Sequence, residues 1–114
     1  MNKTITAPGA PAAVGPYCHA KLSGNTLYTS GQLGLHPETG ALAQGVEAQA
    51  RQAAGMDFSD VVKTTVFLAD MADFAAINQI YAQFFPGEAP ARSCVAVKEL
   101  PKGGLFEIEA VAVR

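Results

Sequence analysis

The chain has 114 residues, of which 49% are hydrophobic and 16% are charged, and its formal net charge is −2. This length and composition predict one compact domain covering residues 1–114 and exclude a disordered chain. The slight excess of acidic residues argues against binding to nucleic acid, because proteins that bind nucleic acid carry a basic surface.

The first sixteen residues are rich in proline and glycine and are predicted to form an extended lead-in. They lack the charged start and apolar centre of a signal peptide, and no run approaches the ~18 apolar residues of a membrane span. A cytoplasmic location without membrane contact is therefore expected. Cys18 and Cys94 are expected to stay reduced there. Together with His19 and His36 they match no zinc spacing, so no metal site is expected.

The next part of the chain predicts a hairpin followed by a helix. Residues 17–33, "YCHAKLSGNTLYTSGQL", contain two short strand candidates around a turn signal at Ser23–Asn25. Residues 35–42, "LHPETGAL", read as a polar loop. Residues 46–55, "VEAQARQAAG", form the first helix candidate, which Gly55 is placed to end.

The second half of the chain predicts a strand, a helix and two more strands. Asp60–Asp70 is rich in β-branched residues and reads as a central strand. Residues 74–85, "FAAINQIYAQFF", form the second helix candidate, with Asp73 as its cap and Pro86-Gly87 as its stop. Its apolar residues recur at helical spacing, at Phe74, Ile77, Ile80, Tyr81 and Phe84. Further strands are predicted at residues 93–97 and 104–113.

This order, β-β-α-β-α-β-β, predicts an α+β fold with a mixed sheet and two helices on one of its faces. Strand segments such as "TTVFLA" and "EAVAV" carry apolar residues on both faces, and two helices cannot cover the second face. We therefore expect the protein to self-associate through that face.

The stretch "PARSCVAV" raises the main functional question, because it puts an arginine in a run typical of an interior strand. A buried guanidinium is costly without a partner, since it cannot lose its charge. Alternation places Arg92 and Cys94 on one face of their strand, while Glu107 and Glu109 share a face of the last strand. Either Arg92 pairs with a glutamate of a neighbouring strand, or it binds a ligand carboxylate while a glutamate handles a proton. The spacing alone does not decide between these readings.

Five other residues each have a functional and an ordinary interpretation. Ser30 and Gly31 end a strand candidate, where glycine allows backbone N–H groups to approach a ligand but a bulge or bend is the commoner cause. Tyr17 fits either a cover over a small ligand or an ordinary packed aromatic. Cys94 fits a nucleophile or, more commonly, a small buried hydrophobe. Asn78, in the middle of a helix, predicts either a polar contact or a solvent-facing side chain.

Taken together, these segments resemble one family. "GPY", "YTSGQLGLHPETG", "VVKTTVFLADMADFAAIN", "YAQFF", "PARSCVAV" and "LPKGGLFEIEAVAV" occur in the order found in the reactive intermediate deaminase family, RidA, also called YjgF-like. The resemblance implies a chorismate-mutase-like fold, a homotrimer and sites in the clefts between subunits. It also implies hydrolysis of 2-imino acids and their enamines, such as 2-iminobutanoate and 2-iminopropanoate, to 2-keto acids and ammonia. No metal or organic cofactor is implied.

The resemblance also implies a role for each candidate residue. Arg92 matches the arginine that grips the substrate carboxylate, and Glu107 matches the glutamate proposed to activate the attacking water. Cys94 matches a residue that lines the same pocket, and Asn78 one that lies near it. The residues that match cleft-closing positions of the adjoining subunit are Tyr17, Ser30 and Gly31.

One departure from the family and two alternative functions accompany this expectation. Between "EAQARQ" and "AAG", at residues 47–55, the chain is about three helical turns shorter than its relatives. One alternative is a sensor that binds 2-keto acids without catalysis, which would need Arg92 but no general base. The other is a ribonuclease or translation inhibitor, an activity also ascribed to this family, against which the acidic charge balance weighs.

Overall fold

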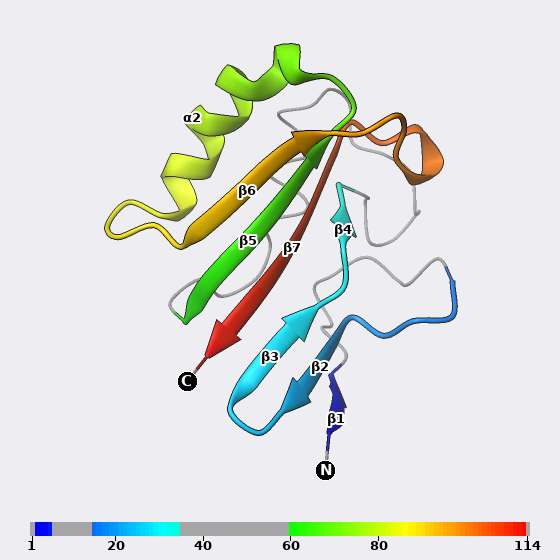
Figure 1. Cartoon of the computed structure of the whole chain (residues 1–114), viewed down its shortest axis with the longest axis vertical. Coiled ribbons are helices and arrows are strands. Elements are labelled where there is room, and N and C mark those ends of the chain that lie inside the picture. Colours follow the sequence, from blue (N-terminus) through cyan, green and yellow to red (C-terminus); the bar gives the residue numbers. More distant parts are fainter. Residues whose placement is uncertain (1, 6–14, 35–59, 114) are drawn as a thin grey trace.

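The computed structural model of the chain describes residues 2–5, 15–34 and 60–113. This described part contains one seven-stranded mixed sheet and one α-helix, α2, beside it (Figure 1). The sheet order is β1-β2-β3-β7-β5-β6, and β4 also pairs with β7. The strands are β1 (Lys3–Ile5), β2 (Ala20–Ser23), β3 (Thr26–Thr29), β4 (Gln32–Leu33), β5 (Val61–Leu68), β6 (Ala91–Ala96) and β7 (Phe106–Val113). The helical segments are η1 (Met71–Asp73), α2 (Phe74–Phe84) and η2 (Pro101–Gly103).

The predicted hairpin of residues 17–33 is confirmed as the antiparallel pair β2 and β3. Its turn contains Gly24 at φ 61°, a left-handed conformation that glycine adopts without strain. The lead-in holds one strand that the sequence reading missed, because β1 pairs with β2 over only three residues. A segment this short has too little alternation to be recognised from its sequence.

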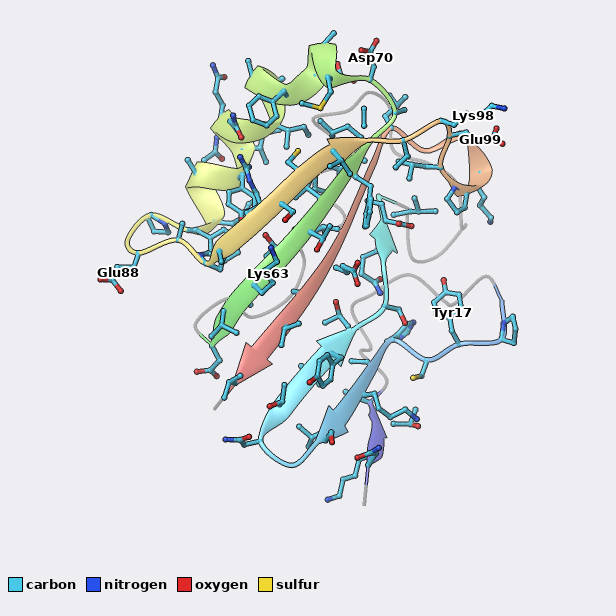
Figure 2. The ribbon with its side chains drawn as sticks, viewed as in Figure 1. Tyr17, Lys63, Asp70, Glu88, Lys98 and Glu99 are labelled. Carbon is cyan, nitrogen blue, oxygen red and sulfur yellow. The ribbon has the colours of Figure 1, made fainter. Side chains whose placement is uncertain are left out.

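The predicted central strand and second helix are confirmed as β5 and α2. β5 lies between β7 and β6 and runs parallel to β6, so α2 forms the crossover between two parallel strands. Asp73 occupies the N-cap position of α2 as predicted, but its side chain makes no capping hydrogen bond. Instead Asp70 accepts a bond of 2.9 Å from the Ala72 N–H and caps η1, the turn that precedes α2 (Figure 2).

The main core lies between α2 and one face of the sheet, which we call the helix face. Alternate residues of β5 and β7 point to this face, and the buried cluster consists of Val66, Leu68, Ile77, Ile80, Phe106 and Ile108. The other helix candidate, residues 46–55, lies outside the described residues, as does the predicted polar loop at 35–42. No helix within the described ranges has the length and apolar character needed to cross a membrane.

We call the opposite side of the sheet the open face. The strand register assigns to it Tyr28, Leu33, Lys63, Thr65, Phe67, Ser93, Val95, Glu107, Glu109 and Val111. Leu100 packs with Leu33 and Phe67 over one end of this face. Elsewhere the face includes exposed apolar side chains, since Tyr28 is 51% and Val95 46% exposed. The self-association inferred from the sequence stays a prediction, and these exposed side chains are compatible with it.

A bulge separates β3 from β4 and explains the glycine that ends the predicted strand. Tyr28 pairs with Val111 and Gln32 with Ile108, so the segment from Thr29 to Gly31 faces a shorter segment of β7. The extra residue interrupts the backbone ladder. The Ala110 N–H donates instead to the Thr29 hydroxyl, at 2.9 Å. The side chain of Thr29 therefore replaces a missing carbonyl at the bulge.

Thr29→Val should lower the free energy of unfolding by about 1–3 kcal/mol, because it keeps the side-chain shape but leaves a buried N–H without an acceptor. Chemical denaturation measures the change. Thr26→Val is a matched control on the same strand, since the Thr26 hydroxyl only bonds Asn25 at the surface. An unfolding free energy in Thr29→Val that equals the wild-type value would contradict the role of Thr29 in the bulge.

Candidate active site

The candidate residues fall into two groups on opposite faces of the sheet. Arg92 lies directly opposite Thr64, whose side chain is buried on the helix face, whereas Glu107 lies opposite Phe67 on the open face. Of the two readings that the sequence left open, the ion pair between Arg92 and a glutamate of the last strand is therefore wrong within this chain. β5 separates β6 from β7, and alternation sends Arg92 and Glu107 to different faces. We call the two sets the arginine group and the glutamate group.

The arginine group is built on β6 and α2. The Arg92 Nη1 donates to the Asn78 Oδ1 at 2.8 Å. The Arg92 Cζ lies 4.8 Å from the ring centroid of Tyr81 and 5.5 Å from that of Phe74, within the range of cation–π contacts. The three helix residues are spaced i, i+4 and i+7, so they form one stripe along α2. The polar contact expected of Asn78 is thus present, and its solvent-facing alternative is wrong.

The positive charge of Arg92 is held by neutral groups. Within residues 2–5, 15–34 and 60–113, no carboxylate forms an ion pair with its guanidinium, which is half-buried. A fixed guanidinium offers several N–H donors in a planar fork that matches a carboxylate. This arrangement can bind an anion.

Cys94 belongs to the arginine group by position. It lies two residues after Arg92 on the same face and packs against the main core cluster. Burial raises the pKa of the Cys94 thiol, and the nearby charge of Arg92 opposes that rise without cancelling it. The thiol therefore stays protonated near neutral pH, which favours a pocket-lining residue over a nucleophile.

The glutamate group is built on β7 and the bulge. A Cβ atom on Gly31 would lie 2.8 Å from the Glu107 Cδ, so only glycine lets this carboxyl rest against the bulge. The Ser30 hydroxyl donates to the Cys18 carbonyl at 2.5 Å, and the Ser30 N–H donates to the His19 carbonyl at 2.9 Å. Ser30 thus ties the bulge to the segment before β2. These bonds fix the position of Gly31 beside Glu107.

The surroundings of Glu107 favour its protonated form. Half-burial between Leu33 and Phe67, its neighbours across the sheet, raises the pKa of the Glu107 carboxyl, and the negative charge of Glu109 raises it further. A carboxyl with a raised pKa can exchange a proton closer to neutral pH than an exposed glutamate. Perturbed carboxyl groups of this kind are common in active sites.

Tyr17 precedes Cys18, whose carbonyl accepts the hydrogen bond from Ser30 of the glutamate group. It lies on the loop before β2, near one end of the sheet order, whereas Arg92 lies on the edge strand at the other end (Figure 2). Its side chain is 44% exposed. The described residues also contain no cluster of three or more His, Cys, Asp or Glu that could hold a metal ion.

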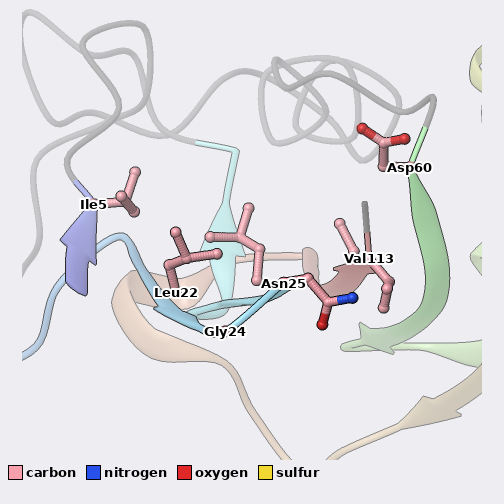
Figure 3. Close-up of a pocket in the computed structure, with 8 residues that line it drawn as sticks. Ile5, Leu22, Gly24, Asn25, Asp60 and Val113 are labelled. Carbon is pink, nitrogen blue, oxygen red and sulfur yellow. The ribbon is translucent and has the colours of Figure 1, made fainter. Parts of the chain in front are cut away.

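A cavity of about 450 Å³ lies away from both groups (Figure 3). Its described lining residues come from β1, the β2–β3 hairpin and the ends of β5 and β7, and include Ile5, Leu22 and Val113. None of the seven candidate residues lines it. The candidate site is therefore not this cavity.

Comparison with known proteins identifies the family. The sequence profile of the family described as "Endoribonuclease L-PSP" matches residues 7–114. The chain belongs to this family. A relative from Salmonella typhimurium, named 2-iminobutanoate/2-iminopropanoate deaminase, is 49% identical over 127 residues, which cover 100% of this chain and 99% of the relative. The resemblance to the RidA family is thereby confirmed.

Two solved structures show the same fold in other members of the L-PSP family. The YjgF gene product of Escherichia coli is 47% identical, with a TM-score of 0.90 and 98% of each chain covered. Escherichia coli TdcF with bound serine is 43% identical, with a TM-score of 0.90 and 98% of each chain covered.

The chain is shorter than its Salmonella relative in this family. The alignment with that relative is 127 residues long although the chain has 114, so the chain lacks internal positions that the relative has. The segment where we predicted the shortening, residues 47–55, lies outside the described residues.

Three residues next to the candidate site were not predicted from the sequence to influence it. They are Tyr81 and Phe74 beside Arg92, and Glu109 beside Glu107. Tyr81 and Phe74 read as ordinary apolar residues of an amphipathic helix, and only their spacing relative to Asn78 carried a signal. The spacing indicates a contact with Arg92 only after Asn78 is known to bond to that arginine, because all three residues lie on one stripe of α2. The charge of Glu109 raises the pKa of the Glu107 carboxyl. The sequence placed both residues on one face of the last strand but did not predict this effect.

Glu109→Gln should lower the pKa of the Glu107 carboxyl, because it removes the negative charge that disfavours ionisation of Glu107. The pKa should stay above that of an ordinary glutamate, since the burial of Glu107 is unchanged. Titration of the side-chain carboxyl by NMR measures both values. Glu99→Gln, at an exposed position, is the control and should leave the Glu107 titration unchanged. An unaltered pKa in Glu109→Gln would contradict the coupling.

Proposed function

We propose that this protein is a deaminase that hydrolyses 2-iminobutanoate, 2-iminopropanoate and their enamine tautomers to 2-keto acids and ammonia. It acts in the cytoplasm as a single RidA-like domain with a chorismate-mutase-like fold, without a metal or organic cofactor. Relatives with that activity in their names support the proposal, at 49% identity in Salmonella typhimurium and 47% in Bos taurus.

The observation that carries this proposal is the neutral setting of Arg92. Among the described residues its guanidinium is held by an amide oxygen and two aromatic rings, which leave its charge available for a ligand. A 2-imino acid has a carboxylate that fits the planar fork in a bidentate manner. Escherichia coli TdcF, 43% identical, was solved with bound serine, whose carboxylate is attached to the carbon that carries its nitrogen, as in a 2-imino acid.

Glu107 supplies the proton transfer in this proposal. The carbon of a protonated imine is electrophilic, and Glu107 accepts a proton from the water that attacks it. The same carboxyl then returns that proton to the nitrogen of the carbinolamine. As the C–N bond breaks and ammonia leaves, the ionised Glu107 takes the proton of the carbinolamine hydroxyl, so that the carbonyl of the keto acid forms, and the proton then passes to the released ammonia. The raised pKa of Glu107 supports both steps, because it brings proton exchange by this carboxyl closer to neutral pH than for an exposed glutamate.

The separation of the two groups supports a site shared between subunits. Arg92 and Glu107 point to opposite faces of one sheet, so they cannot meet around one small substrate within a single chain. In the homotrimer that we propose, Arg92, Asn78 and Cys94 of one subunit face a second subunit. The second subunit contributes Tyr17, Ser30, Gly31 and Glu107. The exposed side chains of Tyr28 and Val95 on the open face support burial by a neighbouring copy.

Arg92→Lys should lower kcat/KM for freshly generated 2-iminobutanoate on the order of 10–100-fold, because lysine keeps the charge but loses the bidentate hydrogen bonds. Calorimetry with 2-ketobutyrate should show a matching loss of affinity. The conservative exchange Lys98→Arg at an exposed position is the control. Normal turnover in Arg92→Lys would contradict carboxylate binding by Arg92.

Mixing two impaired variants tests the shared site directly. Glu107→Gln alone should lower turnover on the order of 10²–10⁴-fold, the usual contribution of a general acid–base group. Co-expressed in equal amounts with Arg92→Lys, it should restore about a quarter of the wild-type activity, because about a quarter of the interfaces then combine an intact Arg92 with an intact Glu107.

Light scattering should give three times the chain mass of 11.8 kDa for the mixture and for each variant. Mixed trimers without restored activity would contradict the division of the site between two chains. A monomeric mass for the folded wild-type protein would contradict the trimer.

The same variants separate the deaminase from the two alternatives. A sensor of 2-keto acids would bind 2-ketobutyrate through Arg92 but would not turn over 2-iminobutanoate in the wild-type protein. A ribonuclease would bind RNA in a salt-dependent way, although the chain has 10 acidic residues against 8 basic ones.

A further inference from the structure

Tyr81 connects the two residues that form a cross-strand pair at the arginine group. Its hydroxyl lies 2.8 Å from the Thr64 Oγ1, and its ring centroid lies 4.8 Å from the Arg92 Cζ. Thr64 on β5 and Arg92 on β6 are direct partners in the parallel strand pair. One side chain of α2 therefore contacts both members of the pair, the first through its hydroxyl and the second through its ring.

The ring of Tyr81 is fixed in this place by its helical backbone and by two side-chain contacts. Its backbone is part of α2, its hydroxyl is bonded to Thr64, and the ring of Phe85 lies 4.8 Å away, tilted by 42°. Thr64 is only 1% exposed, so rotation of the tyrosine would leave the threonine hydroxyl buried without its partner. The ring is thus a rigid surface under the guanidinium.

Holding Arg92 by a ring leaves its hydrogen-bond donors available. A guanidinium has five N–H donors, all in its plane, and Asn78 accepts from Nη1. The rings of Tyr81 and Phe74 contact the guanidinium at its Cζ and accept no hydrogen bond from its N–H groups. A carboxylate of the protein in the same role would compete with the carboxylate of a ligand.

We propose that Tyr81 is a positioning residue that sets the plane of the Arg92 guanidinium, while Asn78 sets its rotation within that plane. Thr64 acts through Tyr81 by holding the ring in place. The inference rests on the proposed function, because it takes Arg92 as the residue that binds the substrate carboxylate. It adds that the affinity of the site for carboxylates depends on an aromatic side chain behind the arginine.

Tyr81→Leu removes the ring and should raise the Kd for 2-ketobutyrate by about 3- to 30-fold, the range expected from a cation–π contact of ordinary strength. The keto acid reports binding by Arg92 without any chemistry. KM for 2-iminobutanoate should rise by a similar factor while kcat changes less, because the contact acts on binding of the carboxylate. Ile80→Val removes a buried methylene from the same helix and is the control for loss of packing alone; its Kd should stay at the wild-type value.

Two further experiments distinguish positioning from a structural role. In an Arg92→Lys background, Tyr81→Leu should raise Kd by a smaller factor, because an ammonium keeps the attraction to the ring but has no plane to align; a structural defect would add equally in both backgrounds. The double variant Thr64→Val/Tyr81→Phe removes both hydroxyls and so avoids an unpaired buried group. Its Kd should lie between those of the wild type and Tyr81→Leu.

Each outcome bears on one of the two proposals. A folded Tyr81→Leu with the wild-type Kd overturns the positioning role while the function of Arg92 stands. If Tyr81→Leu does not fold, a wild-type Kd in Thr64→Val/Tyr81→Phe overturns it instead. A wild-type Kd in Arg92→Lys overturns both proposals. If the wild-type protein shows no deaminase activity but Tyr81→Leu weakens keto-acid binding, the positioning role is supported and the deaminase is contradicted.

Discussion

The alternation of side chains across one mixed sheet is the constraint on which the candidate site depends. Because β5 lies between β6 and β7, the in-register residues Thr64, Val66 and Leu68 fix which face each neighbour points to. Arg92 is thereby directed to α2, and Glu107 is directed away from it. No rotation of a side chain can bring the two charges together around one small ligand within the chain. The proposed function and the proposed assembly therefore depend on each other.

The two groups differ in how they keep their key side chain in place. Arg92 is held by side chains of a regular helix, whose spacing of one and two turns brings Phe74, Asn78 and Tyr81 to one stripe. Glu107 lies on a regular strand, but its environment comes from an irregularity, the bulge that ends in Gly31. The bulge is stable because side-chain hydroxyl groups replace the lost backbone bonds, as Thr29 does for the Ala110 N–H. A regular helix thus positions Arg92, and an irregular bulge positions Glu107.

Much of the fold followed from local patterns, whereas the relation between the two groups did not. β5 and α2 were predictable because β-branched residues and helical periodicity are properties of contiguous segments. The pairing of β7 with β5 and with β3 joins residues far apart in sequence, and no local pattern encodes it. Alternation placed Arg92 and Cys94 on one side of their strand correctly. It could not relate that side to the side of Glu107, and for this reason the sequence alone left an Arg–Glu pair open as an alternative to ligand binding.

Neither charge of the candidate site is balanced by an opposite charge among the described residues. Arg92 is half-buried without a carboxylate among the described residues, and Glu107 is half-buried beside Glu109, which disfavours its ionisation. Each charge alone lowers the stability of the folded chain, because neither is fully hydrated or paired. In the proposed trimer the positive group of one subunit approaches the negative group of the next, so assembly reduces both penalties at once. A ligand with a carboxylate at one end and a cationic imine at the other complements both groups, and it neutralises them more completely than either subunit can.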